Sequence, residues 1–334
     1  MATINMQDYL FQQIKEKLPP SASLADTVST LLNVSTDSAY RRIRGETPLV
    51  LEEAAILCKQ FGISLDTLLS IDKRMISFLP VQLTGEYTFE RYLQDILASF
   101  KRIEAHGNKN ITYLTKDVPL FYHFMLRPLF AFRYFFWMKS ILQHPDFAGR
   151  KFSVDMLPAS IEQTGQEILK QYNNIPSTEI WNTEAVNSVI SQVEYYRTAG
   201  YFNAPEDVEL VYDSLRKTLQ HLKEQAEYGC KFGPGDTPLS RKSNYRLFYN
   251  SMVLGDNTIL VETDSRKTLY LIYDVLNYMT TQDEHFCNDV SDKLQVLMKR
   301  GTIISNVSEK QRSVFFNILL RKIPTRIANT INGQ

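Results

Sequence analysis

Apolar residues recur at intervals of three and four along the first seventy residues, which is the spacing of one face of a helix. The pattern predicts four helices in this stretch and a short fifth one. Residues typical of helix ends accompany them: Ser23, Ser35 and Ser64 at starts, and Pro19, Gly45 and Gly62 at ends. The predicted helices cover residues 7–18, 24–32, 35–45, 51–61 and 65–70.

A tight turn is expected between the second and third of these helices. Asn33 tolerates the left-handed backbone that such a turn needs, and Ser35 can cap the helix that follows. Ala39 and Ile43 lie four residues apart and therefore share the inward face. The remaining face carries hydroxyls near its N-terminus and guanidinium groups further on. A short helix of this kind suits entry into the major groove of DNA.

The same residues carry a resemblance to a known family. The small Ser29, the turn Asn33-Val34-Ser35, the ending Arg44-Gly45 and the segment FGISLDTLLS occur in order and at the expected spacing. Together they resemble the Cro and lambda-repressor type of helix-turn-helix domain, the xenobiotic-response-element-like class of bacterial regulators. The segment SAYRRIRGE also resembles the related domain of betaine-responsive bacterial regulators.

The resemblance implies which side chains contact DNA. The base-reading positions of the family fall on Thr36, Asp37 and Arg41. Phosphate contacts are expected from Ser35, Arg42 and Arg44. The family usually has an apolar residue at the position of Arg42 and often Glu at that of Ile43, so the inward face is shifted by one residue. Which of Arg41 and Arg42 reaches base edges therefore stays open, and Asp37 either accepts from a cytosine amino group or points away from the DNA.

The distribution of charge bears on how strongly the chain can bind DNA. The whole chain has a formal net charge of zero, so no global field attracts nucleic acid. Residues 1–70 contain six basic and eight acidic side chains, a net charge of −2, yet three of the six basic ones lie on the candidate reading helix. Such a module has little nonspecific affinity for DNA. We therefore expect a homodimer that binds two half-sites of double-stranded DNA.

The rest of the chain predicts a second, larger domain that is mainly α. A linker at 72–87 separates a helix-turn-helix domain at 1–71 from a dimerisation or regulatory domain at 88–334, with a sub-boundary near 230–240. Helices are expected at 88–105, 160–172, 183–199, 205–229, 289–300 and 308–323, with a short strand at 111–114. After Gly229, segments 245–253 and 258–262 flank Gly255-Asp256-Asn257 and predict a small β-hairpin, while periodicity leaves 267–277 as a strand or a helix.

An aromatic segment at 121–142 is long enough to be a membrane span. Arg127 and Arg133 lie inside it, and each costs about 2.5–3.5 kcal/mol near the centre of a bilayer. Pro128 interrupts it as well. We interpret the segment as a buried helix bent near Pro128, and its composition does not decide which aromatic residues of 121–137 line a cavity and which only pack.

Candidate catalytic chemistry is sparse in the sequence. The five histidines are scattered, and residues 283–287 (DEHFC) match no known metal signature, so no metal site and no cofactor are expected. Gly233-Pro234-Gly235 lacks the Gly-Lys-Ser/Thr ending of a phosphate-binding loop. Three widely separated cysteines and the absence of a signal-peptide pattern predict a reducing, cytoplasmic location. The sequence predicts no enzyme.

The hypothesis that follows is a cytoplasmic bacterial regulator that binds DNA sequence-specifically. Its larger domain would dimerise it and sense a small-molecule or peptide effector. The alternative is a protein-interaction module without DNA binding, with a peptide groove in the helical hairpin at 183–229. A docking surface needs exposed apolar residues on the helix at 35–45, where this sequence offers Thr, Ser and Arg. That observation favours the regulator.

Overall fold

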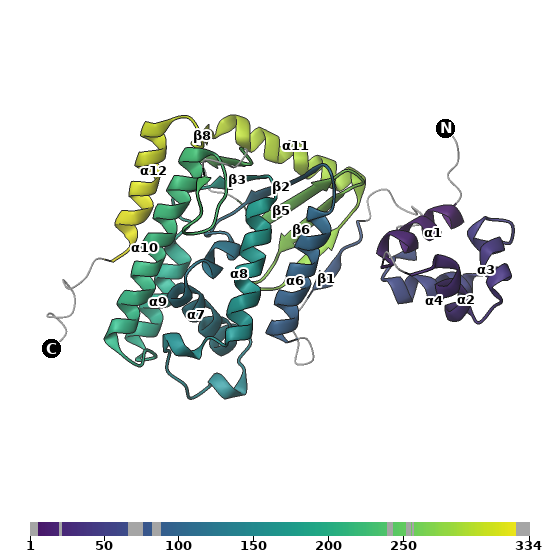
Figure 1. Cartoon of the computed structure of the whole chain (residues 1–334), viewed down its shortest axis with the longest axis horizontal. Helices are drawn as coiled ribbons and strands as arrows, with labels where there is room; N and C mark the ends of the chain where they lie inside the picture. The colour runs from purple at the N-terminus through teal and green to yellow at the C-terminus, as the bar shows by residue number, and fades with distance from the viewer. Residues whose placement is uncertain are drawn as a thin grey trace. The chain divides into compact units, whose positions relative to one another are not determined.

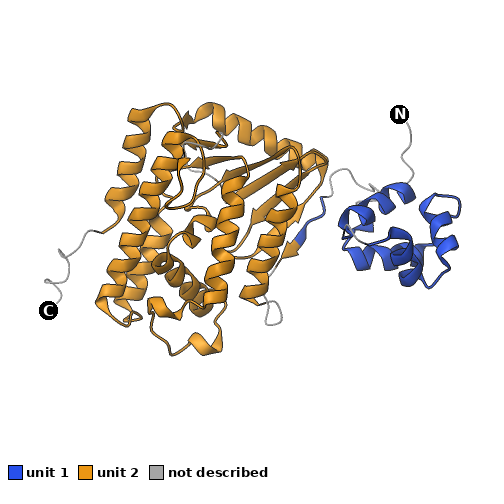
Figure 2. Cartoon of the chain, in the orientation of Figure 1, with its two compact units in different colours: residues 1–79 blue, residues 80–334 orange. Residues whose placement is uncertain are grey.

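The protein was analysed as a computed structural model that describes residues 6–19, 22–65, 76–81, 88–238, 243–251, 255 and 257–324. The chain forms two compact units (Figure 2). Unit 1 covers residues 1–79 and unit 2 covers residues 80–334. Each unit has its own hydrophobic core and is described by itself.

Unit 1 is a bundle of short helices whose positions follow the predicted pattern (Figure 1). Side chains from all four helices, Ile14, Val28, Ala39 and Leu57 among them, are fully buried in its core. The fifth predicted helix, at 65–70, lies outside the described residues apart from Leu65. The described helices are α1 (Met6–Lys17), α2 (Leu24–Leu32), α3 (Thr36–Ile43) and α4 (Leu51–Phe61).

Unit 2 is built on an eight-stranded mixed sheet in its described part, so the prediction of a mainly α fold is wrong. The strand order is β1-β7-β6-β5-β2-β3-β4-β8. The strands are β1 (Leu79–Val81), β2 (Lys109–Leu114), β3 (Ser177–Trp181), β4 (Tyr245–Tyr249), β5 (Thr258–Thr263), β6 (Lys267–Ile272), β7 (Tyr278–Thr281) and β8 (Thr302–Ile303). The chain is an α/β protein in this unit.

Parallel strands occupy the middle of the sheet and antiparallel strands flank them. β3 pairs in parallel with β2 and with β4, and each parallel pair is joined by a helical crossover. β5, β6 and β7 form an antiparallel meander beside β2. The predicted β-hairpin around residues 255–257 is therefore wrong: β4 pairs with β3 and β8, whereas β5 pairs with β2 and β6. Residue 256 of the predicted turn lies outside the described residues.

Two layers of helix enclose the sheet (Figure 1). Alternate side chains of β2 point to opposite faces: Ile111 and Tyr113 join the larger core, and Leu114 joins the smaller one under α11. The larger core is covered by α6 (Phe89–Glu104), α7 (Arg127–Phe136), α8 (Ala159–Asn174), α9 (Asn187–Thr198), α10 (Pro205–Tyr228) and α12 (Glu309–Lys322). The opposite face is covered by α11 (Glu284–Arg300).

The aromatic segment packs inside the larger core, in three short pieces. A 3-10 helix, η1 (Leu120–Phe124), precedes α7, and a π-helical turn, η2 (Trp137–Ile141), follows it. Pro128 lies in the first turn of α7, where its missing N–H costs no hydrogen bond, so it begins a helix instead of bending one. Within the described residues, no helix has the length and apolar character needed to cross a membrane.

Candidate functional site

The turn between α2 and α3 has the backbone that the sequence predicts. Asn33 adopts the left-handed conformation, with φ 53° and ψ 47°, and its N–H donates to the carbonyl of Ser29. The Ser29 hydroxyl donates to the carbonyl of Val34 at 2.7 Å. Ser29 therefore ties the end of α2 to the entry of α3, which explains why a small hydroxyl residue occupies this position.

Ser35 begins α3 as its N-cap. Its Oγ accepts from the backbone N–H of Ser38 at 3.2 Å and donates to the Ser38 hydroxyl at 3.0 Å. One turn later, Ala39 is fully buried and leaves room for the close approach of α2. These two residues fix the start and the inward face of the helix, and they leave its opposite face exposed.

The exposed face of α3 holds the three predicted base-reading residues. Thr36, Asp37 and Arg41 are all exposed. Arg44 is exposed just beyond the helix, and the guanidinium groups of Arg41 and Arg44 lie 3.7 and 3.2 Å from the Glu46 carboxylate. Both arginines keep more than half of their side-chain surface exposed, so these ion pairs are weak and accessible.

Arg42 lies in a different environment. Its side chain is only 16% exposed, and its Nε and Nη2 donate to the two carboxylate oxygens of Glu53 at 3.0 and 2.8 Å. This hydrogen bond lowers the pKa of Glu53 and raises that of Arg42. Arg42 is thus engaged within unit 1, and of the two neighbouring arginines Arg41 is the one whose side chain is mostly exposed.

Tyr40 is a residue that the sequence patterns did not single out. It lies on α3 between the buried Ala39 and the exposed Arg41, and half of its surface is exposed. An aromatic ring at this position offers an apolar surface for the methyl group of a thymine. Helical periodicity places Tyr40 near the edge of the exposed face, and that is the signal that identifies it.

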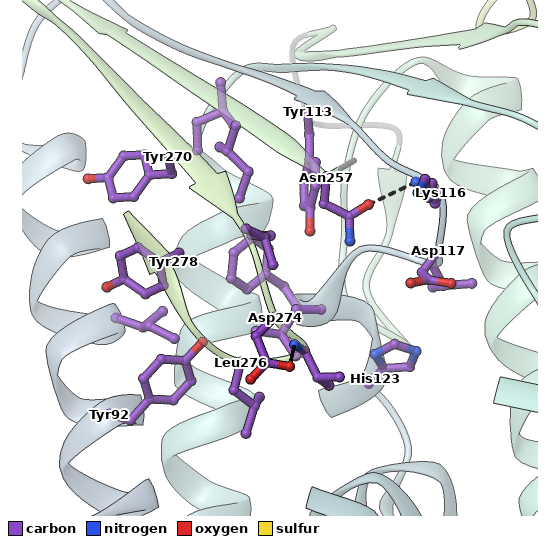
Figure 3. A pocket seen from close by; sticks show the side chains of 18 of the residues that line it. Tyr92, Tyr113, Lys116, Asp117, His123, Asn257, Tyr270, Asp274, Leu276 and Tyr278 are labelled. Atoms are coloured by element: carbon purple, nitrogen blue, oxygen red, sulfur yellow. Dashed lines mark hydrogen bonds between the residues drawn. The ribbon is translucent and has the colours of Figure 1, made fainter. Parts of the chain in front are cut away.

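Unit 2 contains a cavity of about 440 Å³ on the face of the sheet that α6, α7 and α9 cover. The volume is in the range of small-molecule sites. Its walls come from α6, β2, η1, α7, α9 and the β5–β7 meander, which are far apart in the sequence. In Figure 3 the rings of Tyr92, Tyr270 and Tyr278 lie along one side, and Lys116, Asp117 and His123 lie on the other.

The cavity is mostly apolar along its body. Tyr92 and Tyr278 have ring centroids 6.4 Å apart, and Tyr278 and Tyr270 lie 5.8 Å apart. Ile96 and Ile259 are among the aliphatic side chains of the same wall. This surface can hold an apolar or aromatic group.

The loop between β6 and β7 closes part of this wall. The two carboxylate oxygens of Asp274 accept from the backbone N–H of Val275 at 2.6 Å and from the side-chain amide of Asn277 at 3.1 Å. These bonds hold the loop so that Leu276 is buried in the cavity wall.

A polar cluster occupies one end of the cavity. His123 of η1 is 1% exposed, and neither of its ring nitrogens has a hydrogen-bond partner among the described residues. Burial, together with the nearby charge of Arg133, lowers the pKa of His123 well below its ordinary value, against the opposing effect of the Leu120 carbonyl. The imidazole is therefore neutral at pH 7 and has one N–H to donate and one nitrogen to accept with.

Arg133 of α7 is the charged member of this cluster. It is 6% exposed, donates to the side-chain oxygen of Gln192, and stacks against the rings of Trp137 and Phe136, with its guanidinium carbon 5.0 and 5.5 Å from their centroids. Burial lowers the pKa of Arg133 to about 10, against the opposing effect of Asp117. The guanidinium is therefore still cationic at neutral pH.

The buried carboxylate of Glu179 joins β3 to η1, α8 and β4 through hydrogen bonds. Glu179 of β3 is fully buried, and Tyr122 and Tyr172 donate to its Oε1 at 2.7 and 2.5 Å. Trp181 and Tyr245 each donate to its Oε2 at 2.9 Å. Tyr122 belongs to η1, so this network sets the position of the 3-10 helix that carries His123.

The other candidates from the sequence do not come together. The side chains of residues 283–287 have separate partners. Asp283 caps α11, Nδ1 of His285 lies 3.4 Å from Oδ2 of Asp289, and Cys287 is buried beneath α11. No group of three potential metal ligands occurs in the described part of the chain. Comparisons with known protein families, with curated proteins and with solved structures return no match.

Proposed function

We propose that the protein is a sequence-specific DNA-binding transcriptional regulator, with α3 as the helix that enters the major groove. The observation that carries the proposal is the exposed face of α3, where Thr36, Asp37 and Arg41 project side by side from a helix held by the left-handed turn at Asn33. In the proposal, unit 2 senses a small molecule and holds two copies of the chain together.

The chemistry of this face matches that of base edges. Arg41 can donate two parallel hydrogen bonds to O6 and N7 of a guanine, and Asp37 can accept from the amino group of a cytosine. Arg44 and Ser35 lie where they contact phosphates in the proposed complex. Arg42 acts differently, because its pairing with Glu53 makes it a positioning residue that joins α3 to α4.

The weak charge of unit 1 favours a paired arrangement. Each copy brings few free cations to the DNA, since Arg41 and Arg44 share the Glu46 carboxylate. Two copies on one DNA molecule add their contacts, and the geometry of paired helix-turn-helix modules places half-sites one helical turn or a multiple apart. We propose a homodimer on a two-fold symmetric operator.

The interaction-module alternative has less support from the structure. The inward faces of α9 and α10, which would have to line the peptide groove, are filled by the core of unit 2: Val193 and Leu215 are fully buried there. The two helices also form the crossover between β3 and β4. This leaves their apolar faces no free groove for a peptide.

Selection from a random-sequence pool of double-stranded DNA tests the proposal. The full chain is incubated with the pool at two salt concentrations, and light scattering gives the mass of the complex. We expect recovery of one two-fold symmetric sequence bound by a dimer. Salt-dependent binding without selection of a sequence would show that α3 binds DNA only through its charge, which contradicts the proposal. The absence of any binding would favour the interaction module.

A further inference from the structure

We propose that the cavity of unit 2 binds a small organic acid with one carboxylate and an apolar or aromatic body. This names the chemical class of the small molecule that unit 2 is proposed to sense, and so rests on that part of the proposed function, but it does not depend on DNA binding. In the bound state the carboxylate contacts Arg133 and His123, and the body lies along the tyrosine wall formed by Tyr92, Tyr270 and Tyr278 (Figure 3).

Arg133 carries a buried positive charge that lacks a counter-charge among the described residues. A buried guanidinium ordinarily has a carboxylate partner, because an isolated charge is costly to remove from water. Within the described chain, Arg133 donates only to the neutral amide oxygen of Gln192, its Nε has no partner, and no carboxylate forms an ion pair with it. A carboxylate entering the cavity supplies the missing counter-charge and fits the planar fork of the guanidinium.

Polar groups that can bind an anion lie together at one end of the cavity. His123 adds a neutral imidazole at the same end, with both nitrogens unpartnered at 1% exposure. Its N–H can donate to a second oxygen of the ligand. One buried cation and one buried neutral donor at the same end, followed by a wall of rings, match a molecule with a single anionic head.

The remaining charges around the cavity decide between an acid and an amine. Asp117 is half-buried, and it raises the pKa of Arg133 without pairing with it directly. Lys116 is exposed at the same loop, and Asp274 is exposed and bonded to its own loop. Because Asp117 is only half-buried whereas Arg133 is buried, the charge that lacks a counter-ion among the described residues at this end of the cavity is positive. That favours the acid.

The contact is expected to contribute strongly. A charge-assisted, two-pronged bond between a guanidinium and a carboxylate in a desolvated site exceeds an ordinary hydrogen bond about twofold in strength. Replacement of the carboxylate by an uncharged amide of the same shape is therefore expected to weaken binding about tenfold to a hundredfold.

Calorimetric titration of the full chain with matched probes tests the proposal. Hydrocinnamate, hydrocinnamamide and phenylpropylamine share one aromatic body and differ in the head group, and octanoate tests an aliphatic body. We expect an acid to bind at least about tenfold more tightly than the amide and the amine. Equal binding of acid and amide, preference for the amine, or no acid binding below about 1 mM would each overturn the proposal.

Variants place the binding in this cavity. Arg133→Met keeps the length of the side chain, and we expect it to bring the affinity for the acid down to that for the amide. Lys101→Met removes an exposed cation of α6 that does not line the cavity, and as the matched control it is expected to leave the acid preference in place. Acid preference that survives in a folded Arg133→Met chain would contradict the assignment.

Failure of acid binding and failure of DNA binding give different experimental results. The comparison of acid with amide uses the unaltered chain, so it does not depend on whether a variant folds, and it contains no DNA. Failure to bind DNA leaves its result unchanged, and failure to bind acids leaves the result of the DNA selection unchanged.

Discussion

Arg42 of α3 and Glu53 of α4 are joined by two hydrogen bonds, from Nε to Oε2 at 3.0 Å and from Nη2 to Oε1 at 2.8 Å. The backbone carbonyl of Arg42 also accepts from the side-chain amide of Gln7 of α1 at 2.6 Å. Arg42 therefore connects three helices of unit 1. The angle at which α3 presents its exposed face depends on a residue that itself points away from that face.

The first prediction concerns this pair. We expect Arg42→Ala and Glu53→Ala each to lower the free energy of opening of α3 by about 1–3 kcal/mol, because each leaves a half-buried charge without its partner. The double variant should cost less than the sum of the two. Hydrogen exchange of the α3 amides measures the effect. Arg44→Ala, which breaks a highly exposed pair, is the control, and strictly additive losses would contradict a direct coupling.

The second prediction concerns the buried carboxylate of unit 2. Glu179→Gln replaces an acceptor oxygen with an N–H₂ group that faces the donors of two neighbouring side chains. We expect unit 2 to lose about 2–4 kcal/mol of its free energy of unfolding. Denaturant unfolding followed by tryptophan fluorescence reports on this unit, because Trp137 and Trp181 are the two tryptophans of the chain and both lie in it.

Glu184→Gln is the matched control for that measurement. Glu184 follows β3 closely in the sequence but is exposed, so its loss is expected to change stability by less than about 0.5 kcal/mol. A Glu179→Gln variant as stable as this control would show that the four donors do not depend on the carboxylate.

The third prediction is a pH dependence that arises from Lys231. Its ammonium group lies 3.6 Å from the ring centroid of Tyr172, and burial lowers its pKa from the ordinary 10.5 to about 7, against the opposing effect of Glu179. Between these two values the unfolded chain binds more protons at this residue than the folded chain does. The contribution of Lys231 to stability therefore rises with pH from about 7 to about 10.

The comparison of the full chain with Lys231→Met isolates this contribution. The tyrosines around Glu179 have pKa values raised by burial, so their own contribution is lost only above pH 10, where the unfolded chain ionises first. Unfolding followed by tryptophan fluorescence between pH 7 and 9.5 gives the difference in stability between the two chains. A difference that stays constant over this range would contradict the prediction.

Local features of the fold could be read from the sequence because short-range contacts determine them. Ser23, Ser35 and Thr88 cap their helices with the expected side-chain bonds. Gly62 and Gly229 end theirs in the left-handed conformation. These signals depend on residues within one helical turn, and the predicted strand at 111–114 was also confirmed as part of β2.

The sheet could not be read in the same way. β3 is buried along its whole length, so its residues lack the alternation of polar and apolar positions that marks a half-exposed strand. The turn residues near 255–257 predicted a hairpin, but β4 instead pairs with β3, whose residues lie more than sixty positions earlier in the sequence. Pairings over such separations depend on the packing of the whole unit.

The cavity could also not be predicted from local sequence patterns. Its walls are brought together from residues between Tyr92 and Tyr278, and no local pattern links them. Two of the polar residues in the aromatic segment, His123 and Arg133, are nevertheless buried, whereas Arg127 and Lys139 are partly exposed. Buried polar groups in such a segment are the sequence feature that could have indicated the cavity. The structure also distinguishes the aromatic residues that line the cavity from those that only pack: Phe121 lines it, whereas Phe130 and Phe135 lie in the core.

The central claim is that the exposed face of α3 reads DNA, and the affinity of Arg41→Ala for the selected operator and its single-base variants tests it most directly. The account predicts a loss of about 1–3 kcal/mol and relaxed preference at one base pair. Lys59→Ala, which removes an exposed cation of α4, should keep the full preference. An Arg41→Ala chain with unchanged affinity and unchanged preference at every base pair would contradict the claim.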